Sequence, residues 1–141
     1  MIWEVENTDE FGGWFLDLTE ADQDAIDFTV DLLMAQGPNL RFPHTSRIGN
    51  SRHSHMRELR IQSEGRPLRV FYAFDPRRSA ILLIGGDKTG DERFYERMIP
   101  KADDLYDVHL MELKQALSSV ELSVASVSSL MPCILSMPRP A

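Results

Sequence analysis

Cysteine is nearly absent from this chain of 141 residues, since Cys133 is the only one. A single cysteine excludes an intramolecular disulfide framework and a metal site made of cysteines alone. No apolar run approaches the roughly 20 residues that span a bilayer. The N-terminus, MIWEVENTDEF, is acidic and lacks the basic and apolar regions of a signal peptide. These absences predict a soluble, cytoplasmic protein without a membrane partner.

Positive charge is missing from the first part of the chain. Residues 1–40 contain ten acidic residues and no Lys or Arg, whereas residues 41–101 contain thirteen Lys or Arg and seven acidic residues. The net charge of −7 hides this asymmetry. A basic segment can create a local positive field within an acidic protein, which suits a phosphate-rich ligand. The alternative is that the acidic helices neutralise the basic segment through ion pairs within the chain.

Residues 56–95 contain three consecutive runs with the pattern of strands. Alternate residues of the middle run share an apolar face: Leu68, Val70, Tyr72 and Phe74. Turn residues at 63–65 and 75–78 separate the runs, so we expect an antiparallel meander. The third run, 80–84, is apolar at every position, which predicts a strand that is covered on both faces at the centre of the sheet.

Helix signals flank this sheet on both sides. A short strand at residues 2–5 precedes a helix that begins at Thr8-Asp9, and Thr19 with Asp22 resembles a capping box that opens a longer helix. Gly37-Pro38 closes it. Its apolar stripe is expected to face the sheet: Ala21, Ala25, Phe28, Leu32 and Leu33.

The rest of the chain completes an α+β fold. Residues 39–55 are expected to form an irregular loop with one short strand. Helical pieces at 93–98 and 101–117 follow the sheet, separated near Pro100. The prediction is therefore a small antiparallel or mixed sheet packed against two N-terminal helices, with a C-terminal helix.

Four residues are the first candidates for a site. Arg60 and Arg69 can stand on one sheet face if the strand register allows, and each guanidinium is a rigid fork suited to phosphate oxygens. Lys88 and Tyr95 follow the third strand. The alternatives are that both arginines are ordinary solvated residues, or that Arg60 and Glu58 pair with neighbours. Lys88 could likewise be only a residue of the turn, and Tyr95 a core aromatic.

Further basic residues and one pair of histidines are candidates for contacts with a phosphate-rich ligand such as a nucleic acid. Arg57 opens the first strand of the meander, and Arg77 and Arg78 lie in its second turn. His53 and His55 are candidate acid/base groups, but no carboxylate or cysteine cluster accompanies them, so no metal is expected. The glycine-rich turn at 85–90 does not match the phosphate-binding motif GxxxxGK[ST], so nucleotide hydrolysis is not expected. No cofactor is expected.

An ordered set of motifs resembles the RelE/HigB family of bacterial toxins, specifically its phage-derived branch. The resemblance covers about residues 1–114. Its motifs are EF at 10–11, GPNLRFP at 37–43, ELR at 58–60, RVFYAFDP at 69–76, LLIGGDKTG at 82–90 and FYERMIPKAD at 94–103. The resemblance implies a RelE-like fold and a toxin domain at 1–117. Residues 118–141 match nothing in the family pattern, and we expect a helical extension, a disordered tail or a sequence from a shifted reading frame.

The resemblance also implies a function. Toxins of this family enter the ribosome and cut mRNA without a metal, because the RNA 2′-hydroxyl attacks the adjacent phosphodiester. A helix-turn-helix antitoxin silences them, commonly in a hetero-oligomer. By position, Arg69 would stabilise the scissile phosphate, Lys88 would stabilise the phosphate or transfer a proton, and Tyr95 would stack on or orient the nucleotide. The alternatives are a ParE-like toxin that binds gyrase and an inactive module that binds only the antitoxin.

Overall fold

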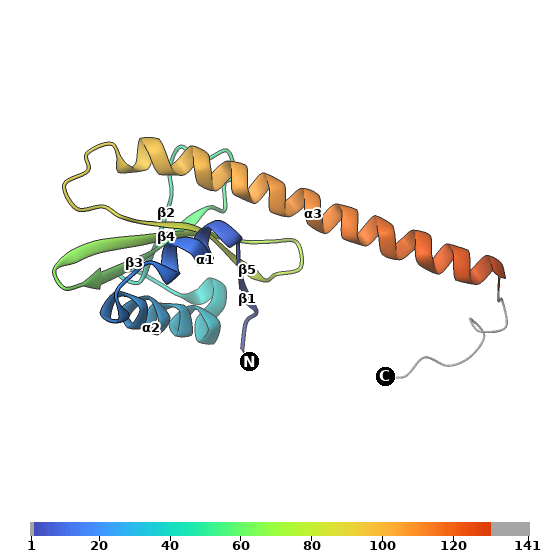
Figure 1. Cartoon of the computed structure of the whole chain (residues 1–141), viewed down its shortest axis with the longest axis horizontal. Helices are drawn as coiled ribbons and strands as arrows, with labels where there is room; N and C mark the ends of the chain where they lie inside the picture. Colours follow the sequence, from blue (N-terminus) through green and yellow to red (C-terminus); the bar gives the residue numbers. More distant parts are fainter. Residues whose placement is uncertain (1, 131–141) are drawn as a thin grey trace. The chain divides into compact units, whose positions relative to one another are not determined.

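A five-stranded mixed sheet forms the centre of the protein, which we describe from a computed structural model of residues 2–130 (Figure 1). The strands are β1 (Val5–Asn7), β2 (Thr45–Arg47), β3 (Arg57–Ser63), β4 (Arg66–Phe74) and β5 (Ala80–Asp87). The helices are α1 (Asp9–Leu16), α2 (Glu20–Gln36), the 3-10 turn η1 (Gly37–Asn39) and α3 (Phe94–Leu130).

The sheet order, β1-β5-β4-β3-β2, confirms the antiparallel meander of β3, β4 and β5. The edge strand β2 pairs antiparallel with β3, and β1 pairs parallel with β5. The expectation that β5 is the central strand was wrong, because β4 occupies the middle. β5 is nevertheless an interior strand, since β1 pairs with its first three residues. Aromatic residues of α1 and α3 pack on its two faces, and this cover explains its continuous apolar run.

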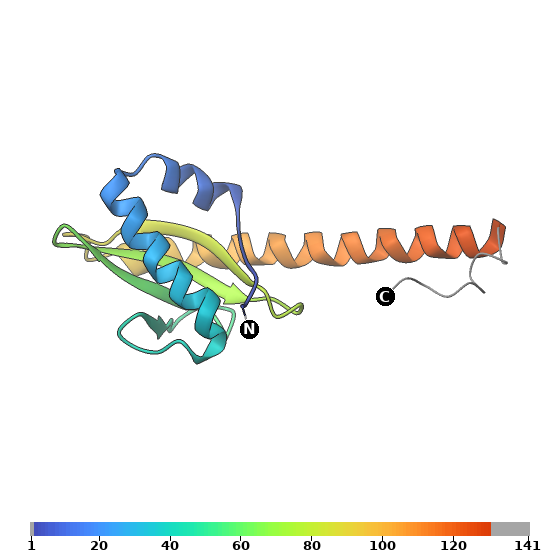
Figure 2. The same ribbon diagram turned by 90° about the horizontal axis from the view of Figure 1, so that it is seen from below.

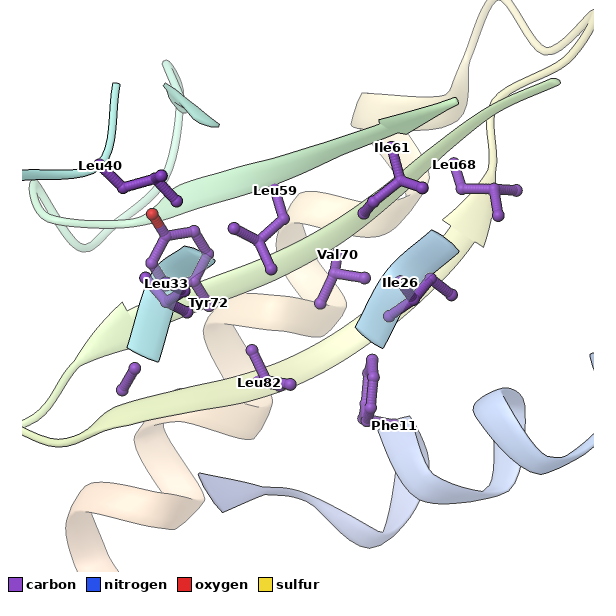
Figure 3. Packing of buried hydrophobic residues seen from close by; sticks show 11 residues of the cluster. Phe11, Ile26, Leu33, Leu40, Leu59, Ile61, Leu68, Val70, Tyr72 and Leu82 are labelled. Carbon is purple, nitrogen blue, oxygen red and sulfur yellow. The ribbon is translucent and has the colours of Figure 1, made fainter. Parts of the chain in front are cut away.

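Helices cover both faces of the sheet. Helices α1 and α2 lie on one face, and the beginning of α3 lies on the other (Figures 1 and 2). The core under α2 combines residues of that helix with alternate residues of the strands (Figure 3): Ile26, Leu33, Leu59, Ile61, Leu68, Val70, Tyr72 and Leu82. The two faces of each strand therefore contact different helices, which is why the period-two pattern of β4 was readable from the sequence.

Both N-terminal helices begin where their capping residues predict. The Thr8 hydroxyl accepts a hydrogen bond from the Phe11 amide at 3.0 Å, and the Thr19 hydroxyl accepts one from the Asp22 amide at 3.2 Å. The predicted stripe of α2 was wrong at Ala21, which is exposed, and at Phe28, which is 62% exposed. Ile26 faces the core instead, because the helix turns a buried polar residue, Asp22, toward the sheet.

Asp22 joins α2 to the β3–β4 hairpin. Both of its carboxylate oxygens accept hydrogen bonds from the Arg66 guanidinium, at 2.5 and 2.6 Å, and one accepts a third from the Ser63 hydroxyl at 2.7 Å. The bonds from Arg66 and Ser63 hold the pKa of Asp22 below its ordinary value, although burial opposes them. A polar clamp therefore sets the position of α2 on the sheet.

Helices α3 and α1 approach the sheet at two adjacent glycines, Gly86 and Gly85 respectively, which lie inside β5 and not in a turn as the sequence suggested. A Cβ on Gly86 would come within 2.8 Å of the Phe94 ring, and a Cβ on Gly85 would come within 2.2 Å of the Trp14 ring on the other face. The missing side chains therefore let aromatic residues pack directly on the strand from both faces.

The expected break near Pro100 does not occur, because α3 is continuous through it. Proline removes the amide that would bond to the carbonyl four residues earlier, at Glu96. Both Glu96 and Pro100 are exposed, so water can satisfy that carbonyl.

The chain divides into two compact units, Met1–Tyr106 and Asp107–Ala141. The first unit contains the sheet, α1, α2 and the beginning of α3. The second continues α3 to Leu130, which makes the first part of the expected tail helical. Residues 131–141 lie outside the described residues. No helix formed by residues 2–130 has both the length and the apolar character needed to cross a bilayer.

The Asp22 clamp predicts a specific dependence of stability on pH. Because the pKa of Asp22 is lowered in the folded state, the stabilisation is complete above its ordinary value of 3.8 and is lost as the pH falls through the folded value. The substitution Asp22→Asn should lower the melting temperature at neutral pH by about 5 °C or more.

Thermal unfolding followed by circular dichroism from neutral to strongly acidic pH would measure this effect. The difference between the parent protein and Asp22→Asn should shrink as the solution becomes more acidic. The control Asp24→Asn changes an exposed residue of the same helix and should behave like the parent. A difference between parent and Asp22→Asn that does not change with pH would contradict the clamp.

Candidate active site

An open concavity of about 370 Å³ lies between the end of the sheet and helix α3. Strand β2 and the loop after it contribute Arg47 and Asn50, β3 contributes Glu58 and Arg60, and α3 contributes Tyr95. These residues are far apart in the sequence. The pairing of β2 with β3 and the packing of α3 on the sheet bring them together.

The register of β3 against β4 decides which side chains share this face. Arg60 lies directly opposite Arg69, which confirms that the two arginines stand on the same face of the sheet. Glu58 lies opposite Phe71 on the same face. The Phe71 ring contacts the Phe94 and Tyr95 rings at centroid distances of 5.9 and 6.2 Å, so the sheet face and α3 hold each other in place at the site.

A buried carboxylate lies at the centre of the site. Glu58 is 2% exposed and accepts a hydrogen bond from the Tyr95 hydroxyl. The hydroxyl oxygen lies 2.6 Å from Glu58 Oε1 and 2.9 Å from Oε2. The Arg69 Nε atom lies 3.0 Å from Glu58 Oε1. Its N–H is not aligned with that oxygen, so the contact is an ion pair and not a hydrogen bond. Arg69 Nη1 donates to the Leu68 carbonyl at 3.0 Å.

These contacts fix the protonation state of Tyr95. Burial and the hydrogen bond to the Glu58 carboxylate raise the pKa of Tyr95, and the nearby Arg69 only partly opposes them. The phenol therefore keeps its proton at neutral pH and acts as a hydrogen-bond donor. It cannot serve as a base under those conditions.

Two cations near the site have no carboxylate partner in the described part of the chain: Arg60, which lines the concavity, and Lys88, which contacts the lining residue Tyr95. The Lys88 ammonium lies 5.0 Å from the centre of the Tyr95 ring, and the Arg60 guanidinium lies 5.1 Å from the centre of the Phe42 ring. The Lys88 amide donates to the Pro67 carbonyl at 2.9 Å, which fixes the backbone that carries the side chain. Both cations are partly exposed, so an anionic ligand can reach them.

Other arginines of the basic segment are neutralised within the chain. Arg66 pairs with Asp22 and Asp87, Arg77 with Asp75 and Glu6, Arg52 with Asp103 and Asp104, and Arg97 with Asp91. Internal ion pairing was the alternative to a phosphate-binding surface. It applies to these arginines and leaves Arg60 and Lys88 available.

A buried carboxylate of α3 holds one wall of the concavity. Asp103 is 2% exposed and accepts hydrogen bonds from the Ser51 hydroxyl at 2.5 Å and the Arg52 amide at 3.0 Å. These residues directly follow the lining loop that ends at Asn50. The loop therefore depends on the same helix that carries Tyr95.

The remaining RNA-binding candidates are dispersed. Arg57 lies opposite Tyr72, on the other sheet face from Arg60, because adjacent residues of a strand alternate. Arg77 and Arg78 lie at the β4–β5 turn, at the opposite end of β4 from Arg69. His53 packs edge-on against the Tyr106 ring at 4.7 Å, and His55 lines a separate concavity. None of these five lines the site.

Sequence reasoning missed two residues of the site. Glu58 was considered only as a residue that pairs with neighbours, whereas it pairs with Arg69 and accepts a hydrogen bond from the Tyr95 hydroxyl at the site. Arg47 was not considered, because nothing in the loop sequence indicates that β2 lies beside β3. The alternation of Glu58, Arg60 and Gln62 did indicate that they share a face, but it could not indicate that Glu58 is buried.

The protein is therefore a small α+β protein with a mixed sheet. Two arginines line its concavity, and such a surface is suited to an anionic ligand. Residues 13–107 match the sequence profile of the family described as "Phage derived protein Gp49-like". The chain is 41% identical over 91 residues to "Putative toxin HigB3" of Mycobacterium tuberculosis, covering 64% of this chain and 78% of that protein.

A second relative in sequence and one solved structure are also toxins by their names. The chain is 32% identical over 110 residues to "Putative toxin HigB2" of the same organism, covering 77% of this chain and 55% of that protein, so it spans about half of the HigB2 length. The fold is similar to that of a mutant of the E. coli toxin RelE in the free state, with a TM-score of 0.52 and 9% identity. That likeness covers 70% of this chain and 96% of RelE.

The chain belongs to the RelE/HigB family of toxins, in its phage-derived, Gp49-like branch. This agrees with the resemblance carried by the sequence motifs. The similarity to RelE is one of fold alone. In this chain the fold is a mixed five-stranded sheet with two N-terminal helices on one face and the beginning of a third helix on the other.

The buried Glu58–Arg69 contact makes a prediction about stability. Glu58→Gln and Arg69→Met each leave one buried charge without its partner, so each should lower the free energy of unfolding by about 3 kcal/mol. The double variant removes both charges and should lose less than the sum, by at least about 1 kcal/mol. Urea unfolding of the four proteins would measure the coupling. Single effects that simply add would contradict a direct interaction.

Proposed function

We propose that this protein is the toxin of a toxin–antitoxin system and that it cuts mRNA on the ribosome as a metal-independent endoribonuclease. One observation carries the proposal: Arg60 and Tyr95 line a concavity with the buried carboxylate of Glu58, which Arg69 contacts, and the Lys88 ammonium lies over the Tyr95 ring. Family membership supports the toxin role. The concavity is open, so it can accept a strand that is already bound elsewhere.

The proposed reaction is attack by an RNA 2′-hydroxyl on the adjacent phosphorus. The bond from phosphorus to the 5′-oxygen breaks, which leaves a 2′,3′-cyclic phosphate and a free 5′-hydroxyl. The reaction needs a proton acceptor for the 2′-hydroxyl, cations for the charge that develops on phosphorus, and a proton donor for the leaving oxygen. It requires no cofactor and no metal.

The geometry suggests a role for each group. Among the described residues that line the concavity, Glu58 is the only carboxylate, and we propose it as the acceptor of the 2′-proton. Lys88 and Arg60, which have no carboxylate partner in the described chain, would stabilise the phosphate, and the Lys88 ammonium would protonate the leaving oxygen. Arg69 is 5% exposed and contacts Glu58, so it would act mainly by orienting that carboxylate and by its positive charge.

Tyr95 would support the reaction in two ways. Its hydroxyl donates to Glu58 and orients it, and the exposed part of its ring can stack on a nucleotide base, which is a contact that tolerates any sequence. Because the phenol stays protonated, Tyr95 would not itself remove the 2′-proton.

The proposed partners are the ribosome, its mRNA and a helix-turn-helix antitoxin, in keeping with the family. We also propose that the toxin domain ends by residue 117 and that residues 118–141 are an appendage to it. The family match, which ends at residue 107, supports this boundary.

Growth of a bacterial host after induction tests the proposal. The parent protein should arrest growth, and mapped mRNA 5′ ends should fall within translated codons, in frame. Lys88→Ala should reduce cleavage about a hundredfold or more, because a transition-state cation is lost. The control Lys101→Ala removes an exposed lysine that does not line the concavity, and it should remain toxic.

Three outcomes would contradict parts of the proposal. Full toxicity of an Arg69→Ala, Lys88→Ala double variant would refute the assigned site. DNA-damage signalling without mRNA cuts would indicate a gyrase-binding toxin of the ParE type. Equal cleavage of mRNA by the purified protein with and without translating ribosomes would refute the dependence on the ribosome.

A further inference from the structure

A second concavity of about 320 Å³ adjoins the β2–β3 pair and collects basic side chains. Arg47, Arg57 and His55 line it with Ser54, and Pro38 and Phe74 supply apolar surface. No carboxylate is among the described residues that line it. The concavity is separate from the proposed active site, but Arg47 borders both.

The two arginines are direct cross-strand neighbours. Arg47 of β2 lies opposite Arg57 of β3 in the antiparallel register, so their side chains leave the sheet on the same face, about 5 Å apart at Cβ. Like charges in this position destabilise a strand pair. The edge strand β2 has only three residues, so it has few other interactions to offset this repulsion.

The chain does not neutralise this pair internally. Within residues 2–130 neither arginine forms an ion pair, and Arg57 makes one long hydrogen bond, from Nε to the Thr45 hydroxyl at 3.4 Å. Arg66 and Arg77, by contrast, each bind two carboxylates. A pair of adjacent cations left without an acid in a concave surface is suited to an anion from outside the chain.

The chemistry of the lining residues identifies the kind of anion. Two guanidinium forks match the oxygens of a phosphate, and the Ser54 hydroxyl and His55 imidazole add hydrogen-bonding groups. The apolar surface of Phe74 and Pro38 suits a ribose or a base beside that phosphate. A phosphodiester of a nucleic-acid strand has all of these parts.

We propose that Arg47, Arg57 and His55 form a second phosphate subsite, which binds the RNA strand on one side of the nucleotide that is cut. This inference rests on the proposed function. Arg47, which borders both concavities, would connect the two parts of the strand. The subsite adds affinity and sets the direction of the strand across the β2 edge, without taking part in the chemistry.

Binding of uncleavable RNA by the full chain tests the subsite. Fully 2′-O-methylated oligonucleotides have no hydroxyl to react, so fluorescence anisotropy measures affinity alone. For the parent protein, extension from a trinucleotide to a heptanucleotide should increase affinity about tenfold or more. Arg57→Gln and Arg47→Gln should each remove most of this gain and lower the salt slope of heptanucleotide binding by about 1.

Matched variants separate this effect from a general loss of charge. Arg93→Gln removes an exposed arginine that lines neither concavity and should keep the gain from length. Arg57→Lys keeps the charge but loses the fork, so it should be intermediate. Circular dichroism checks that each variant is folded. Equal losses in Arg93→Gln and Arg57→Gln would overturn the subsite.

Thermal stability gives an independent measurement with inorganic phosphate as the probe. Phosphate should raise the melting temperature of the parent protein more than chloride at equal ionic strength, and it should not do so for Arg57→Gln or Arg47→Gln. In buffer without phosphate, Arg47→Gln should melt no lower than the parent, because repulsion is relieved. A clearly lower melting temperature would overturn the argument from like charges.

The two proposals fail in different ways. If the parent binds the trinucleotide and the heptanucleotide with equal affinity, the subsite is refuted and the active site is untouched. If the parent responds to inorganic phosphate through Arg47 and Arg57 but binds neither oligonucleotide, the site takes a free phosphorylated ligand, and the RNA subsite is refuted. The cutting of mRNA on the ribosome is tested separately, because its absence would show as a lack of in-frame mRNA 5′ ends after induction.

Discussion

The contact of Glu58 with Arg69 and Tyr95 is the interaction on which the site depends. It joins β3, β4 and α3 through one buried carboxylate, whose charge is tolerable only because a guanidinium and a phenol surround it. The contact orients the only carboxylate among the described residues of the concavity. It also anchors the helix whose Asp103 holds the lining loop. The stability of the fold and the proposed chemistry therefore depend on the same three side chains.

The sheet separates the acidic N-terminal segment from the proposed active site. The acidic first forty residues lie mostly in α1 and α2, on one face of the sheet, and the proposed active site lies on the other. Two arginines bind acids of the N-terminal segment, Arg66 at Asp22 and Arg77 at Glu6, and these pairs attach that segment to the sheet. Among the described residues, the cations without an ion pair include Arg47, Arg57 and Arg60, which line the concavities, so a protein of net charge −7 can still present a local positive surface.

Local patterns were readable where a residue's role depends on its neighbours in the chain. Thr8 and Thr19 cap helices as expected, and alternation within β4 separates Tyr72 from Phe71 correctly. The sequence patterns failed where contacts between distant segments determine which side chains are buried and where a helix ends. Phe28 is exposed because the Asp22 clamp sets the rotation of α2, and α3 continues through Pro100 because the proline faces solvent.

For the site, the sequence by itself determined the composition: two strand arginines, a lysine and a tyrosine in an order that resembles a toxin family. Only the tertiary structure decided their relations. The register that sets Arg60 opposite Arg69, the burial of Glu58 and the arrival of Arg47 beside Arg57 all arise from pairing between segments far apart in the chain. Such pairing depends on the packing of the whole core, because a shift of one residue would turn every side chain to the other face.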